Sequence, residues 1–226
     1  NIEGERVPVR IHRNNRAKRI SMRADAVKRE IRITMPPYTP TNVALNFVAK
    51  KREWIAARLN SVADAAPIAP GSEIAFEGEG YVIEWREEWP RSVKCAEGRL
   101  LLGGPESSVE ARILRWLRAE ARRVYTEEIA YYCAKANDPV PRLSLGDPRS
   151  RWGSCSSRGT ISLSWRLIMA PVSVRRSVIA HEVAHIRHMN HSAQFYAWLD
   201  TLYDGNRKAA DQWLKMHGTG LQRVGR

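Results

Sequence analysis

The sequence predicts an α+β protein, and three observations support this prediction. Short stretches with alternating apolar and polar residues recur in the first half of the chain, a spacing typical of strands. The second half carries longer stretches with apolar residues at helical spacing. Between them, Gly103-Gly104-Pro105 is the clearest boundary signal. We therefore expect a β-rich, basic N-terminal part with one helix over residues 1–105, and a helical domain with a small sheet over residues 106–226.

In the first half, alternating apolar residues predict strands within residues 6–35, with Asn14-Asn15 as a candidate hairpin turn. Pro36-Pro37 ends the last of these strands. Thr41 is the expected N-cap of a helix over residues 42–61. The remaining expected elements, in chain order, are short strands over 72–103, a long helix over 108–136, a short strand at 143–145, a strand over 160–167, and helices over 173–189, 193–203 and 206–216.

Composition places the chain among ordinary globular proteins. It has 226 residues, of which 43% are hydrophobic and 27% are charged, and these fractions argue against whole-chain disorder. No apolar run approaches the ~20 residues of a membrane span, and the longest helical patterns carry charges every few positions. We therefore expect no membrane partner.

The net charge of +13 is unevenly distributed. Residues 1–60 carry +9, residues 61–110 carry −6 and residues 111–226 carry +10. Such a surface can attract nucleic acid, or it can be a solvated arginine-rich face. The densest basic cluster is Arg10, Arg13, Arg16, Lys18 and Arg19. A nucleic-acid partner of this N-terminal segment is therefore possible, and its signature is binding that weakens steeply with salt.

Three cysteines, Cys95, Cys133 and Cys155, form an odd set without CxxC spacing. This pattern argues against a disulfide framework and against a cysteine-based zinc knuckle. The sequence also shows no secretory signal pattern. We expect a reducing, cytoplasmic location.

The helix expected over residues 173–189 carries the sequence His181-Glu182-Val183-Ala184-His185. Two histidines at i and i+4 lie on one helical face, so their imidazoles can reach the same cation. Glu182 is rotated about 100° from His181 and can contact a metal-bound water without being a ligand. Zinc lowers the pKa of such a water toward ~7, and the glutamate accepts its proton as general base. The pattern predicts a catalytic Glu182 and one zinc ion per chain.

A catalytic zinc site needs three protein ligands and one open position, and His191 is the expected third ligand. The spacing His181-x3-His185-x5-His191 matches the ligand positions of HExxHxxGxxH, although His188 stands where that pattern has Gly. We expect the helix to run slightly further and Asn190 to make the turn, because Asn tolerates the left-handed conformation. His188 is the alternative third ligand, but three ligands on one helix fix tetrahedral directions poorly.

Substrate contacts are expected around this helix. The strand over residues 160–167 can pair with an extended peptide if its edge is free, or it can be an ordinary sheet strand. Trp152 is expected to pack or to line the cleft, and Tyr196, Arg151 and His188 are candidates for stabilising an oxyanion. The candidate substrate-binding residues are Arg151, Trp152, Ser164 and Tyr196.

Three segments together resemble the YgjP-like zinc metallopeptidases, a family similar to the WLM and SprT types. They are residues 150–156 with Arg-Trp-Gly-Ser-Cys, residues 161–171 with Trp-Arg-Leu, and residues 181–195, in which His191 stands between Asn190 and Ser192. The resemblance extends to the basic part around residues 19–37 and 51–55, so it is nearly full-length.

The resemblance implies a zincin-like catalytic domain, with His181, His185 and His191 as zinc ligands and Glu182 as general base. It implies a metal-dependent hydrolase that cleaves peptide or protein substrates. One alternative attached to the family is nucleotide pyrophosphohydrolysis, although the sequence has no Gly-rich phosphate loop. Another is a nucleic-acid-associated protease, because relatives of the SprT and WLM types act on proteins crosslinked to DNA. A cleft lined by several arginines would favour nucleotides, and an apolar cleft with a free strand edge would favour peptides.

Overall fold

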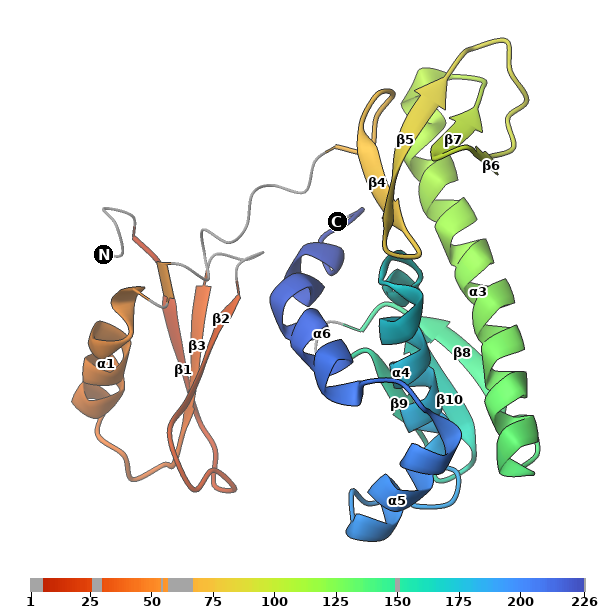
Figure 1. The fold of residues 1–226 in the computed structure, drawn as a ribbon. Helices are drawn as coiled ribbons and strands as arrows, with labels where there is room; N and C mark the ends of the chain where they lie inside the picture. Colours follow the sequence, from red (N-terminus) through yellow and green to blue (C-terminus); the bar gives the residue numbers. More distant parts are fainter. Residues whose placement is uncertain (1–5, 26–29, 54, 57–66, 149–150, 226) are drawn as a thin grey trace. The chain divides into compact units, whose positions relative to one another are not determined.

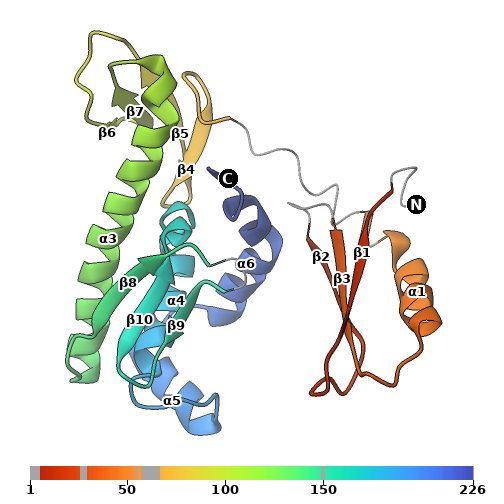
Figure 2. The same cartoon turned by 180° about the vertical axis from the view of Figure 1, so that it is seen from behind.

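The computed structural model describes residues 6–25, 30–53, 55–56, 67–148 and 151–225. Within these residues the chain is α+β, as predicted, with five α-helices and three small sheets (Figures 1 and 2). The chain divides into two compact units, residues 1–65 and 66–226. No helix in the described ranges is long and apolar enough to cross a membrane.

The division between the units lies well before the boundary expected at residue 105. Packing is the physical reason. The strands after residue 70 share one hydrophobic core with the helices that follow them, whereas the core of the first unit consists of residues before 57. Separate cores are what make separate compact units.

The first unit is a three-stranded sheet with a helix packed on one face. Its central strand β3 (Glu30–Met35) pairs in parallel with β1 (Val9–Arg13) and antiparallel with β2 (Ser21–Asp25). The apolar residues of β3 share a core with α1 (Thr41–Lys50). Since β1 and β2 do not pair with each other, the hairpin expected at Asn14-Asn15 is wrong.

The helix of this unit begins at Thr41, and Pro40 occupies the N-cap position expected for Thr41. Proline suits this site because its fixed φ presets the chain entering the first turn. Of the range expected to be helical, residues 57–61 lie outside the described part of the chain.

Several basic side chains of the predicted nucleic-acid segment make contacts within the first unit. Arg10 and Arg32 both form ion pairs with Glu30, at 2.6 and 2.5 Å. The Arg13 guanidinium donates a hydrogen bond to the carbonyl oxygen of Pro37. The Glu30 carboxylate therefore offsets part of the positive charge of this segment. A nucleic-acid partner stays a prediction.

The second unit begins with a four-stranded sheet that packs on a long helix. The strands, in the order β4-β5-β7-β6, are β4 (Glu73–Phe76), β5 (Glu79–Trp85), β7 (Arg99–Leu102) and β6 (Lys94–Ala96). A 3-10 turn, η1 (Glu106–Ser108), leads into α3 (Val109–Ala136). The Phe76 ring lies 4.8 Å from that of Trp116 on α3, so the sheet belongs to the helical domain.

A second sheet, in the order β8-β10-β9, lies beside the C-terminal helices. Its strands are β8 (Arg142–Gly146), β10 (Thr160–Ser164) and β9 (Gly153–Cys155). The strand expected over residues 160–167 stops at Ser164, because the Ser164 Oγ caps the 3-10 turn η2 (Trp165–Met169) by accepting the Arg166 N–H. β10 is the central strand, so of the two alternatives the ordinary sheet strand is the one observed, and the edge strand beside α4 is β9.

Three helices complete the unit: α4 (Val172–Ala184), α5 (Ala193–Leu202) and α6 (Arg207–Leu221). α4 runs between α3 and α6 and also contacts β9 (Figures 1 and 2). The Ser192 Oγ accepts the Phe195 N–H and caps α5. α6 continues beyond the end expected at residue 216, and Gly218 within it does not have the positive φ of a helix-ending glycine.

Candidate active site

α4 is fixed to its neighbours by a buried ion-pair network. Arg175 is 2% exposed and donates two hydrogen bonds to Glu128 on α3, at 2.9 and 3.0 Å. It also forms an ion pair with Glu77, at the turn after β4, at 3.0 Å. The helix that carries the HExxH sequence is thereby tied to α3 and to the four-stranded sheet.

The structure brings the imidazoles of His181, His185 and His191 together. The Nε2 atom of His181 lies 3.1 Å from that of His185 and 3.0 Å from that of His191. Among the described residues these three form a cluster that can hold a metal ion. His181 lies on α4, His185 is the residue that caps its C-terminal end, and His191 comes from the loop before α5.

The chain reaches His191 by a route that differs from the expected one. α4 ends at Ala184, and residues 185–187 form turns, so the helix does not extend to 189. Asn190 does not have a positive φ. Its Oδ1 instead accepts the Ser192 N–H at 3.3 Å, a side-chain turn that replaces the expected left-handed residue.

His188 contributes a backbone group to the cluster. Its carbonyl oxygen lies 2.9 Å from Nδ1 of His185. A carbonyl only accepts, so Nδ1 of His185 carries the proton and Nε2 keeps its lone pair toward the other two histidines. The His188 ring is not part of the described cluster.

Phe195 is the packing centre of the three imidazoles. Its ring, fully buried, lies 4.9 Å from His181, 4.5 Å from His185 and 4.9 Å from His191. A buried aromatic ring limits the rotamers of side chains stacked on it, and so fixes where the ring nitrogens point. The sequence pattern gave no sign of this contact with the histidines.

Burial favours the neutral form of two of the three histidines. Desolvation, followed by the nearby His185, His191 and Arg207, lowers the pKa of His181 to about 4. Desolvation also lowers the pKa of His185. Neutral imidazoles are the form that binds a metal ion.

Glu182 is buried beside this cluster with one carboxylate oxygen free of hydrogen bonds. Glu182 is 6% exposed, and its Oε2 has no hydrogen-bond partner within the part of the chain that the structure describes. Desolvation raises the pKa of Glu182 to about 7, while the positive charge of Arg151 and a backbone hydrogen bond from Cys155 lower it. A buried carboxylate with an unused acceptor atom is costly, which makes Glu182 a candidate functional residue.

Gly153 allows β9 to approach this carboxylate. A Cβ at residue 153 would lie 2.6 Å from Oε1 and 2.7 Å from Cγ of Glu182. No larger residue fits there unless Glu182 moves.

Two adjoining cavities open at the site. The first, about 250 Å³, is lined by β9, by the three histidines, by Glu182 and by Met189. The second, about 230 Å³, shares Gly153, His181 and Glu182 with the first and continues toward α5 and α6.

The four candidate substrate-binding residues are not all at the site. Trp152 and Tyr196 line the second cavity, and Arg151 is exposed and near enough to Glu182 to lower its pKa. Ser164 is fully buried, lines neither of these cavities and serves as the cap of η2. Sequence reasoning missed Arg207 and Asp211, which line the second cavity from α6.

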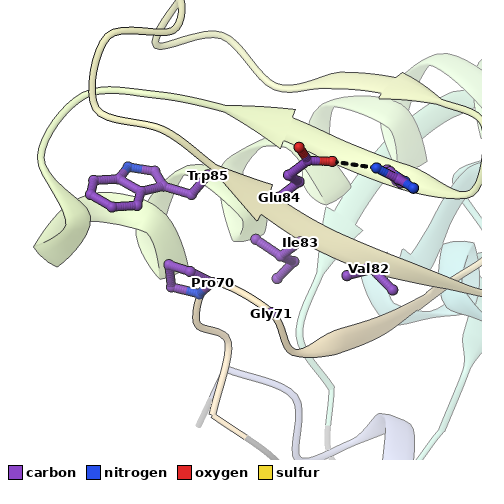
Figure 3. A pocket seen from close by; sticks show the side chains of 7 residues that line it. Pro70, Gly71, Val82, Ile83, Glu84 and Trp85 are labelled. Carbon is purple, nitrogen blue, oxygen red and sulfur yellow. Dashed lines mark hydrogen bonds and ion pairs between the residues drawn. The ribbon is translucent and has the colours of Figure 1, made fainter.

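Another cavity, about 410 Å³, lies over β5 at residues 70–71 (Figure 3). Its walls include Pro70, Val82 and Trp85, and its charged residues Glu84 and Arg99 pair with each other at 2.8 Å. It contains no histidine or cysteine. The chemistry-bearing residues of the unit therefore gather at α4 and not here.

The donor set of the histidine cluster fits a divalent metal. Tetrahedral zinc with Zn–N bonds of ~2.0–2.1 Å separates its nitrogen ligands by about 3.3 Å. The two separations that involve His181 are 3.0 and 3.1 Å, and all three ligand atoms lie within 4.8 Å of one another. Three ring nitrogens facing one another without a carboxylate suit zinc and related transition metals rather than magnesium.

A family model described as YgjP-like, metallopeptidase domain, matches residues 18–217. The chain belongs to the YgjP-like metallopeptidase family. The match spans both compact units and confirms the resemblance carried by residues 150–156, 161–171 and 181–195. Searches of curated proteins and of solved structures returned no match. Membership of the YgjP-like family makes this chain a metal-dependent peptidase at the level of its family, and the histidine cluster is a place where it can hold that metal.

Proposed function

We propose that this YgjP-like protein is a zinc-dependent peptidase with a zincin-like catalytic domain. The observation that carries the proposal is the unpaired, buried Oε2 of Glu182 beside the three facing imidazoles. His181, His185 and His191 would hold one zinc ion per chain, and Glu182 would be the general base.

Zinc, when bound, supplies Lewis-acid chemistry that polarises a carbonyl and makes water more acidic. The Oε2 atom of Glu182 accepts the proton of the attacking water and returns it to the leaving amine. The hydrogen bond from the Cys155 backbone orients the carboxylate. Phe195 holds the ligand rings, and the His188 carbonyl fixes the tautomer of His185.

The edge of β9 is the expected place for an extended substrate backbone. On its inner side, the N–H of Ser164 donates to the carbonyl of Trp152 at 2.8 Å. Hydrogen-bonded and non-hydrogen-bonded pairs alternate in antiparallel sheets, so Gly153 and Cys155 direct their backbone groups to the outer edge. Gly153, Ser154 and Cys155 line the cavity at the histidines, which supports pairing of a peptide with this strand.

The lining of the two cavities supports a peptide rather than a nucleotide substrate. Phosphate recognition needs several cationic groups, but Arg207 is the one arginine or lysine among the residues that line them. Its guanidinium is already paired with Asp200 at 2.7 Å. The site has instead the β9 strand edge and an apolar wall.

Metal analysis tests the proposal first. We expect about one zinc per chain by mass spectrometry of protein purified without chelators, and loss of that zinc in His191→Ala. Zinc that is unaffected by His191→Ala would mean that the third ligand is misassigned.

Turnover tests the role of Glu182. In a screen of peptide substrates, Glu182→Gln should keep its zinc and lose about 10²–10⁴-fold in kcat, because general-base catalysis contributes this much. Full activity in this variant would contradict the mechanism.

A further inference from the structure

The second cavity leads away from Glu182 into the space between α4, α5 and α6. Val178 on α4, Leu199 on α5 and Leu214 on α6 line it, and Trp152 lies at the start of β9. Leu199 is 1% exposed and the other three are half-buried. Four apolar side chains from four elements thus form walls within reach of the candidate general base.

The Trp152 wall depends on a glycine of α6. A Cβ at Gly218 would lie 2.8 Å from the indole of Trp152, so the ring packs directly on the helix backbone. Gly218 is buried in the last turns of the helix. This close packing places the indole against α6 at the wall of the cavity.

The charges at the cavity do not favour an acidic ligand. The Nε of Arg207 donates to Asp200 at 2.9 Å, and the guanidinium lies 5.2 Å over the Tyr196 ring, so its donors are turned to its own neighbours. The carboxylates of Asp211 and Glu182 also line the cavity. An acidic substrate side chain would therefore meet the carboxylate of Asp211 without a free cation to pair with in the lining.

We propose that this cavity is the substrate side-chain site of the enzyme, and that it takes an apolar side chain of leucine to phenylalanine size next to the scissile bond. The inference rests on the proposed function and names the substrate class for it. The volume agrees, because an apolar cavity of ~150 Å³ holds a benzene molecule and this one measures about 230 Å³. It accommodates one large side chain, and an acidic residue at the same position is excluded.

The test measures binding of amino-acid hydroxamates to the zinc-loaded protein by calorimetry. Acetohydroxamate, which has no side chain, reports on the metal site alone, and the hydroxamates of alanine, leucine, phenylalanine and glutamate report on the cavity. We expect the leucine and phenylalanine compounds to bind at least tenfold more tightly than the alanine compound, and the glutamate compound to bind no better than alanine.

Leu214→Trp fills the cavity from α6, which carries no metal ligand, and should abolish the preference for large side chains while acetohydroxamate still binds. Met216→Trp introduces the same side chain at a 61% exposed position of the same helix and should keep the preference. If Leu214→Trp does not fold, the ranking of the affinities of the five compounds for the unchanged protein decides whether the cavity prefers large apolar side chains.

Equal affinity for all side chains, or a preference that survives in a folded Leu214→Trp variant, would overturn the inference and leave the proposed function intact. Failure of acetohydroxamate and of every other compound to bind a zinc-loaded protein would overturn both.

Discussion

At Gly153, one hydrogen atom in place of a methyl group lets β9 approach the carboxylate of Glu182. The Cβ of an alanine would lie 2.6 Å from Oε1, and the carboxylate would have to turn away. We expect Gly153→Ala to lose at least tenfold in kcat with one zinc still bound, since the three histidines lie on other elements. Peptide kinetics and metal analysis of one preparation measure both values.

Gly159→Ala is the control for activity. Nothing lies within 4 Å of a Cβ at this position. The positive φ of Gly159 means that the substitution costs some stability.

The raised pKa of Glu182 has a consequence for the stability of the metal-free protein. The folded state holds this proton more tightly than the unfolded state, so the stabilisation is present below the ordinary glutamate pKa and is lost as pH rises through about 7. Glu182→Gln cannot ionise. We expect it to be more stable than the unchanged protein at pH 8, by up to about 3 kcal/mol, and equally stable near pH 4.

Urea unfolding of chelator-treated protein at the two pH values measures this difference. His181 and His185, whose pKa values are lowered, are present in both proteins and cancel in the comparison. Equal stability at pH 8 would show that Glu182 is not buried as a charged group in the metal-free protein.

At the scale of elements, the position of α4 depends on Arg175 and Glu128. Removing one partner of a buried ion pair leaves the other charged and uncompensated, at a cost of about 3–5 kcal/mol. We expect Glu128→Gln to be destabilised by an amount near the lower end of this range, because Arg175 keeps its ion pair with Glu77.

Glu127→Gln is the matched control for Glu128→Gln, one residue earlier on α3. Glu127 is 63% exposed and pairs with Arg123 at 3.1 Å, and exposed pairs contribute under about 1 kcal/mol. Chemical denaturation of both variants gives the comparison. A similar loss of unfolding free energy in the two variants would mean that the ion pairs of Arg175 do not hold α4 in place.

At the scale of the whole molecule, residues 66–226 contain the larger core and the histidine cluster together. We expect a fragment of residues 66–226 to unfold cooperatively and to bind one zinc per chain, since none of its core residues comes from the first unit. Circular dichroism melting and metal analysis test this. A fragment that is unfolded at 25 °C would show that the first unit supplies essential stability.

Much of the candidate site could be predicted because its signals are local. Two histidines four residues apart meet on one helix wherever the helix packs, and Ser192 caps the next helix through a hydrogen bond within one turn. The spacing to His191 follows from the same short segment. The predicted end of α4 and the predicted left-handed conformation of Asn190 were wrong. A side-chain turn at Asn190 and the hydrogen bond to the His188 carbonyl determine the local structure, and neither leaves a periodic signal in the sequence.

The sequence by itself determined the α+β class, the helix with His181, Glu182 and His185, and membership of the YgjP-like family. Only the tertiary structure decided that β9 and not β10 is the edge strand, that Phe195 packs against all three imidazoles, and that α6 forms a wall of the second cavity. The physical reason is the range of the interactions. Helix periodicity and caps act within a few residues, whereas strand order and cavity walls depend on packing between elements that lie tens of residues apart and leave no pattern within any one segment.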